Sequence, residues 1–84
     1  MVLSQNEKDA ISEYADYIIK RNPNFKKEDF TFTKEFCVSP DVDCDYVITV
    51  NIKNGHKGSM LYVKKKFFKG MQLGKRYTLE DLGL

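Results

Sequence analysis

Residues 46–55 read YVITVNIKNG, and this stretch decides the fold. Apolar side chains occupy alternate positions along its first seven residues, which is the period of a β-strand with one buried face. The Asn54-Gly55 pair that follows is a strong hairpin signal, because both turn positions favour positive φ. The sequence therefore predicts a strand over 46–53 that turns back into an antiparallel strand over 59–68.

A two-residue turn at Asn54-Gly55 also fixes the pairing of the two strands. It places Ile48 opposite Leu61 and Tyr46 opposite Val63, so that these side chains share one face. The same register sends three side chains to the other face: Tyr62, Lys64 and Lys66.

A helix is predicted ahead of these strands, from Ser4 to Arg21. Ser4 and Glu7 have the spacing of a capping box, and Pro23 disfavours helical geometry at the residue before it. Apolar side chains recur every three or four residues along one side of this segment. They are Ile11, Tyr14, Ala15, Ile18 and Ile19.

Alternation with period two recurs between the helix and the hairpin, over residues 30–38. Its expected buried face consists of Phe30, Phe32, Phe36 and Val38. At the other end of the chain, Thr78 begins a second segment that resembles a capping box, and Gly83 limits it to a short helical turn.

These elements predict a two-layer α+β sandwich in which the N-terminal helix packs on a three-stranded antiparallel sheet. With the short C-terminal helical turn, the order is α-β-β-β-α. A chain of 84 residues has room for one domain, so we assign 1–84 to a single small α+β binding domain.

Composition sets the expected environment. No run approaches the roughly 18 apolar residues of a membrane span, and the first residues lack the apolar stretch of a signal peptide. We therefore expect a soluble, cytoplasmic protein with no membrane contact. Cys37 and Cys44 flank an acidic loop; in a reducing cytosol we expect free thiols, with a bridge as the alternative in an oxidising compartment.

Nothing in the sequence assembles a catalytic set. The one histidine, His56, falls in a predicted turn and has no evident nucleophile beside it. Asp41, Asp43 and Asp45 alternate as in a calcium-binding EF-hand loop, but Tyr46 stands where that loop needs glycine. We expect no enzyme activity, no cofactor and no metal.

Charge is distributed unevenly along the chain. Residues 46–79 contain eight basic side chains and no acid, whereas residues 1–45 contain ten acids and six bases. Within the basic half, residues 64–77 combine six cations with three aromatic rings. Such a segment suits phosphate backbones and unpaired bases.

We therefore expect a non-enzymatic accessory module that binds nucleic acid, RNA more than DNA, or single strands. The expected contacts are Lys64, Lys66, Lys69, Lys75 and Arg76 to phosphates, with Tyr62 or Phe68 as stacking groups. The alternative is a small inhibitor or adaptor that docks one charged face on a host protein, as phage and plasmid inhibitors of host enzymes do. A strand-like partner could then pair with an open sheet edge. A third interpretation is a solvated edge strand kept from aggregating by its lysines.

In element order, the chain resembles double-stranded RNA-binding domains. The resemblance implies contact with RNA, but it covers topology alone. That family places a Lys-Lys cluster at the start of a long final helix, whereas residues 64–66 lie here in a predicted strand before a short last turn.

Overall fold

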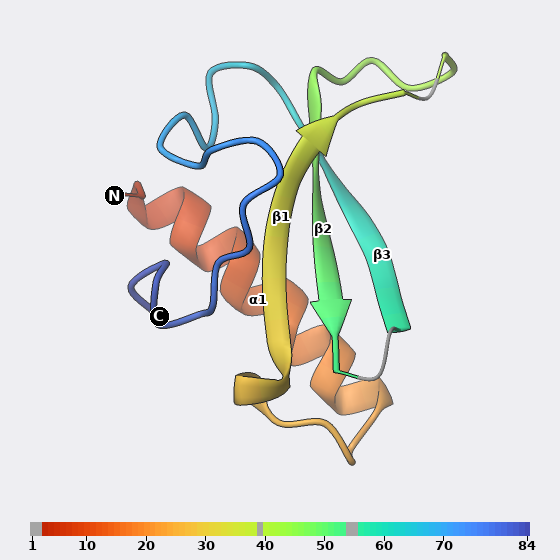
Figure 1. Ribbon diagram of the computed structural model, residues 1–84, viewed down its shortest axis with the longest axis vertical. Coiled ribbons are helices and arrows are strands. Elements are labelled where there is room, and N and C mark those ends of the chain that lie inside the picture. Colours follow the sequence, from red (N-terminus) through yellow and green to blue (C-terminus); the bar gives the residue numbers. More distant parts are fainter. Residues whose placement is uncertain (1–2, 39, 54–55) are drawn as a thin grey trace.

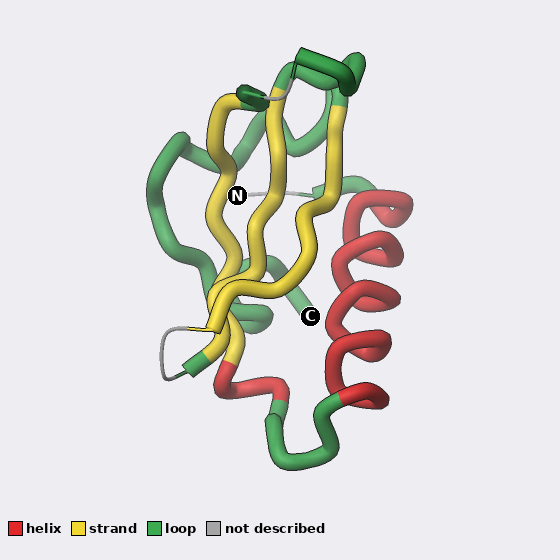
Figure 2. The backbone as a smooth tube through the Cα atoms, turned by 90° about the vertical axis from the view of Figure 1, so that its right-hand side faces the viewer, coloured by secondary structure: helices red, strands yellow, loops and turns green. Residues whose placement is uncertain are grey.

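The computed structural model describes residues 3–38, 40–53 and 56–84, with main chain alone for 56–60. It confirms the predicted α+β fold: one helix covers one face of a three-stranded antiparallel sheet with strand order β1-β2-β3 (Figures 1 and 2). The elements are helix α1 (Gln5–Arg21), the short 3-10 helix η1 (Lys27–Asp29), β1 (Phe30–Phe36), β2 (Tyr46–Ile52) and β3 (His56–Val63).

Helix α1 begins at the predicted capping box. The Ser4 backbone N–H donates to Glu7 Oε1 at 2.8 Å, and the Glu7 N–H donates to Ser4 Oγ at 3.2 Å. These bonds satisfy two of the backbone donors that a helix start leaves free. The helix ends at Arg21, before Pro23, as predicted.

The core lies between α1 and the sheet. The helix buries Ile11, Ala15 and Ile18 from its apolar stripe. The sheet contributes a larger set, and the C-terminal part of the chain completes the cluster. These residues are Phe30, Phe32, Ile48, Val50, Ile52, Val63, Phe68, Met71, Tyr77, Leu79 and Leu82.

The predicted register of β2 against β3 is confirmed where it was specified. Ile48 pairs with Leu61, and Tyr46 pairs with Val63. Nearer the hairpin end, the ladder shifts by one residue between Thr49 and Asn51, so that Ile52 pairs with His56. His56 thus belongs to β3 and not to the turn, while the turn predicted at Asn54-Gly55 lies outside the described residues.

The predicted C-terminal ends of β1 and β3 were wrong, and so was the burial expected of Phe36 and Val38. β1 ends at Phe36, and β3 ends at Val63, because the chain turns away there and residues 64–67 form a turn instead of extending the strand. Phe36 is 64% exposed and Val38 is exposed too. Lys34, which shares their face, is buried instead, because the chain beyond β3 covers its position and leaves Phe36 at the uncovered end of the β1–β2 ladder.

The two edges of the sheet differ. Residues 73–77 run along the outer edge of β1, where the backbones of Phe32 and Tyr77 exchange hydrogen bonds of 2.8 and 2.9 Å (Figure 1). Gly74, at a φ of 78°, donates to the carbonyl of Lys34 at 2.9 Å. Among the described residues, no strand pairs with the outer edge of β3.

The C-terminal capping interaction is present, although it supports one turn only. The Thr78 N–H donates to Asp81 Oδ2 at 2.9 Å, and the Asp81 N–H donates to Thr78 Oγ1 at 3.0 Å. The Leu82 N–H reaches the Thr78 carbonyl at 3.2 Å, which closes a single helical turn.

Replacing Ile18 by Asp tests this packing. The substitution puts a carboxylate without a partner into the core cluster, and we expect it to lower the free energy of unfolding by about 3 kcal/mol or more. Urea denaturation measures the loss. The matched control Glu13→Asp, on the exposed side of α1, should change it by less than about 0.5 kcal/mol. An unchanged denaturation midpoint in Ile18→Asp would contradict the packing of α1 on the sheet.

Candidate binding surface

The predicted basic segment, residues 64–77, is held against the domain by three buried side chains. Phe68, Met71 and Tyr77 each join the core cluster. The Tyr77 hydroxyl also accepts a hydrogen bond of 2.8 Å from the Gln72 N–H. The lysines between these anchors are exposed, so the segment presents cations from a fixed main chain.

Both backbone groups of Phe68 are held by charged side chains. Lys34 Nζ donates to the Phe68 carbonyl at 3.0 Å, and the Phe68 N–H donates to Glu7 Oε2. Phe68 has a φ of 57°, the left-handed region that costs a residue other than glycine about 1 kcal/mol or more. We call this pair of contacts the Phe68 clamp. It joins α1 and β1 to the segment that follows β3.

Lys34 is only 6% exposed, so its ammonium needs partners inside the domain. The Phe68 carbonyl supplies one, and the Tyr46 ring, whose centroid lies 4.3 Å from Nζ, supplies a second. The charge of Lys34 also acts on Glu7. A lysine far away in the sequence therefore favours the carboxylate form of Glu7 at the clamp.

Burial opposes ionisation of Glu7, but the sum of several favourable contacts outweighs it. The backbone N–H groups of Ser4 and Phe68, the Ser4 hydroxyl and the charge of Lys34 together hold the pKa of Glu7 below its ordinary value. The carboxylate form is thus the one that the folded domain favours.

We expect Glu7→Gln to lower stability in a pH-dependent way. Because the pKa is lower in the folded state, the carboxylate stabilises the domain fully above the unfolded-state pKa of about 4.3 and loses that contribution as pH falls through the folded-state pKa. Urea unfolding at a series of pH values should show the variant weaker at neutral pH and the gap closing in acid. A gap that stays constant with pH would contradict the charged role of Glu7.

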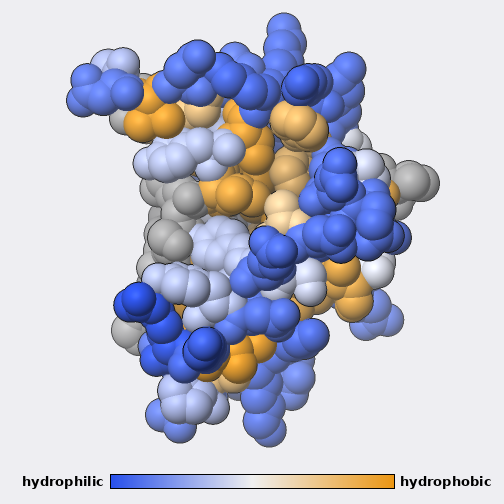
Figure 3. Space-filling view, turned by 180° about the vertical axis from the view of Figure 1, so that it is seen from behind, coloured by the Kyte–Doolittle hydropathy of each residue, from blue (hydrophilic) through white to orange (hydrophobic). Residues whose placement is uncertain are grey.

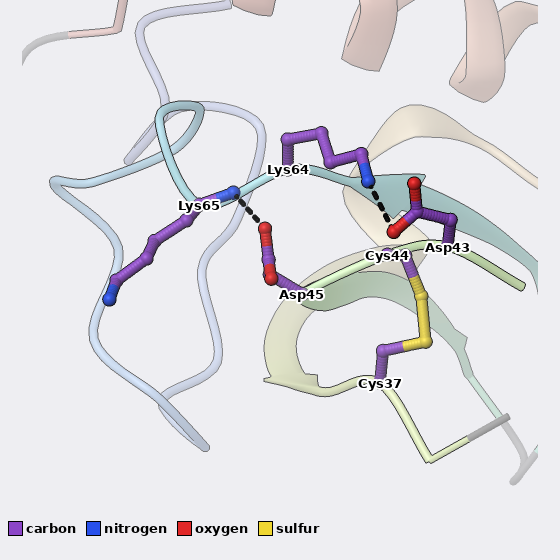
Figure 4. The surroundings of a disulfide bond; sticks show 6 residues. All are labelled: Cys37, Asp43, Cys44, Asp45, Lys64 and Lys65. Carbon is purple, nitrogen blue, oxygen red and sulfur yellow. Dashed lines mark hydrogen bonds and ion pairs between the residues drawn. A yellow bond between two sulfur atoms is a disulfide. The ribbon is translucent and has the colours of Figure 1, made fainter. Parts of the chain in front are cut away.

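The start of the basic segment contacts the acidic loop between β1 and β2 (Figure 4). Lys64 Nζ lies 2.7 Å from Asp43 Oδ1, and the Lys65 N–H donates to Asp45 Oδ2 at 2.7 Å. The hydrogen bond and charge of Lys64 hold the pKa of Asp43 below its ordinary value. Two of the three alternating aspartates of this loop, Asp43 and Asp45, therefore contact the start of the basic segment.

Cys37 and Cys44 form a disulfide that closes this loop (Figure 4). The expectation of free thiols was wrong, because the two sulfur atoms meet across the mouth of the connection between β1 and β2. Within the described part of the chain, no three potential ligands gather into a metal site.

A surface groove of about 260 Å³ lies between the N-terminal half of α1 and β3. Its walls are mostly apolar, and the space-filling view shows apolar side chains gathered in a hollow on this side, bordered by hydrophilic groups (Figure 3). Asn6, Glu7 and Ala10 line it from the helix. The other side is formed by the end of β3 and the chain that follows it, with Leu61, Tyr62, Val63, Lys64, Phe67 and Phe68.

The seven residues expected to contact nucleic acid do not come together on one face. Phe68 is 3% exposed, so its expected stacking role was wrong: its ring fills the core. Tyr62 is 48% exposed and remains accessible. Lys75 and Arg76 lie along β1, three strand spacings or roughly 14 Å from β3. Lys64 is paired with Asp43, while Lys66 and Lys69 are exposed on the segment between these two edges.

Sequence reasoning missed the groove. Phe67 is 39% exposed and lines it, and the Lys66 ammonium lies 5.2 Å from its ring centroid. Nothing in the sequence marked Asn6 and Ala10 as binding residues, because they fall beside the apolar stripe and not in it. Their spacing of four residues indicates only that they share a side of the helix.

Comparison with known proteins gives no relative from which to transfer a role. No protein family model, no curated protein and no solved structure matches this chain. Among the described residues, no helix is long and apolar enough to cross a membrane.

Proposed function

We propose that this chain is a protein-binding module, an inhibitor or adaptor, that docks through the groove between α1 and β3. The observation that carries the proposal is an apolar hollow open at the surface, with Phe67 in its wall and lysines beside it. A concave, mostly apolar lining with a few polar groups at its border is typical of binding sites. An aliphatic or aromatic side chain of a partner fits such walls, because few polar groups there need to be satisfied.

Nucleic-acid binding is the second candidate. It is favoured by the exposed cations of residues 64–76, which the buried anchors Phe68, Met71 and Tyr77 hold in place. We rank it below protein binding for two reasons. The cations are divided between two edges of the sheet, and a nucleobase in the groove would bury polar edges against apolar walls.

Affinity capture with three baits tests the primary proposal: the wild-type domain, Ala10→Gln and Lys75→Gln. Ala10→Gln fills the groove without adding charge, on a helix position where Gln is well tolerated. We expect the wild type and Lys75→Gln to retain the same protein from nuclease-treated lysate, and Ala10→Gln to lose it. The captured protein, once purified, should rebind with the same order of preference.

The same three proteins, titrated with oligothymidylate and with single-stranded RNA, distinguish the second candidate. If about four phosphates are neutralised, log affinity should fall with log salt at a slope near −3, and Lys75→Gln should flatten it. Binding of this kind, with capture that nuclease abolishes and Ala10→Gln leaves intact, would replace the protein-binding proposal.

Two further expectations stay predictions. The absence of enzyme activity rests on the lack of a catalytic set in the sequence. The cytoplasmic location has to be weighed against the Cys37–Cys44 bridge, since disulfides persist in oxidising compartments and are rare in the cytosol.

A further inference from the structure

The groove lies beside the unpaired edge of β3, and the two features together suggest how a partner is held. This inference rests on the proposed function and adds the conformation and chemistry of the partner. On the other side of the sheet, residues 73–77 already satisfy the edge of β1. The outer edge of β3 has no such neighbour among the described residues, so its main-chain groups can accept another strand.

We infer that the partner contributes an extended, acidic segment that adds to the outer edge of β3 and inserts two apolar side chains into the groove. An added strand lies about 4.8 Å beyond β3 and continues its pleat. Its side chains therefore alternate between the face that α1 covers and the open face. This alternation ties the partner's sequence to the residues of β3.

The end of β3 shows which side chains the partner needs. Leu61 and Val63 face α1 and line the groove, so partner side chains beside them enter it and meet Ala10 and Phe67. Tyr62 lies between them on the open face, half exposed. The partner segment should therefore have an apolar residue, then any residue, then a second apolar residue. The side chain of the middle residue should pack on the Tyr62 ring as a cross-strand neighbour.

The acidic character follows from the charges at the end of the groove. Lys65 and Lys66 have no acidic side chain at ion-pair distance within the described part of the chain. Lys66 stands over the Phe67 ring in the groove wall. Of the three acids nearby, Glu7 is engaged at the Phe68 clamp, Asp43 is paired with Lys64, and Asp45 accepts the Lys65 N–H. Carboxylates next to the apolar pair would thus meet cations and no free acid.

The test selects peptides from a displayed random library on the wild-type domain and counter-selects on Ala10→Gln. We expect enriched peptides to share two apolar residues separated by one position, with Asp or Glu at one end. Ala10→Gln should weaken synthetic copies by about tenfold or more, and Lys66→Gln should weaken them less and make binding less sensitive to salt. Lys75→Gln, at the β1 edge, is the matched control and should leave the affinity unchanged.

Backbone methylation separates strand addition from other modes. N-methyl groups on alternate amides that face β3 should abolish binding, while methylation of the intervening amides should not, because only the first set donates to the strand. Peptides that tolerate both sets, or that bind as helices, would overturn strand addition and leave the groove as the docking site. Failure to enrich any peptide that discriminates Ala10→Gln would overturn the inference itself.

Two further outcomes have their own readouts. Sedimentation of the wild type as a dimer that Ala10→Gln dissociates would show a second copy of this chain on the edge and overturn the partner strand. If protein capture depends on Ala10 but peptide binding does not depend on which amides are methylated, the proposed function stands and only strand addition is contradicted. Loss of both the Ala10-dependent capture and the peptide binding would contradict the proposed function and strand addition together.

Discussion

The buried ammonium of Lys34 is the constraint on which the rest of the structure depends. A charge at this depth is stable only with partners, and the nearest polar partner is the carbonyl of Phe68, 34 residues further along the chain. Glu7 holds the N–H of the same residue from the helix side. These two contacts hold the chain after β3 back over β1 and against the start of α1.

The clamp also shapes the candidate binding surface. With the Phe68 ring drawn into the core, the neighbouring Phe67 is left half exposed at the groove, and the lysines on either side remain in solvent. Further along, Tyr77 and Gly74 attach the same segment to the edge of β1. One edge of the sheet is thus closed by the protein itself, while the other, beside an apolar hollow, has no paired strand in the described part of the chain. This asymmetry is the physical basis of the proposed function.

The fold was predictable from the sequence because its signals are local. The capping box at Ser4, the apolar stripe of α1 and the alternation in β2 each lie within a few residues, and they sufficed for the layers and for the pairing of Ile48 with Leu61. The site was less predictable because its contacts are not local. Lys34 interrupts an apolar face, and nothing near it in the sequence indicates that its partner is the carbonyl of Phe68. Counting charges along the chain likewise located the cations, but it did not show that they are divided between the two edges of the sheet.

Amide hydrogen exchange in Lys34→Met tests the central claim most directly. Methionine keeps most of the buried volume but donates no hydrogen bond, so the clamp loses one of its two contacts. We predict that the amides of Phe68 and Met71 exchange at least about tenfold faster relative to those of the central strand β2, because a hydrogen bond to a charged group contributes about 1.5–3 kcal/mol. Exchange that rises equally in β2 and in the basic segment, or that does not change in either, would contradict a structure held together at Phe68.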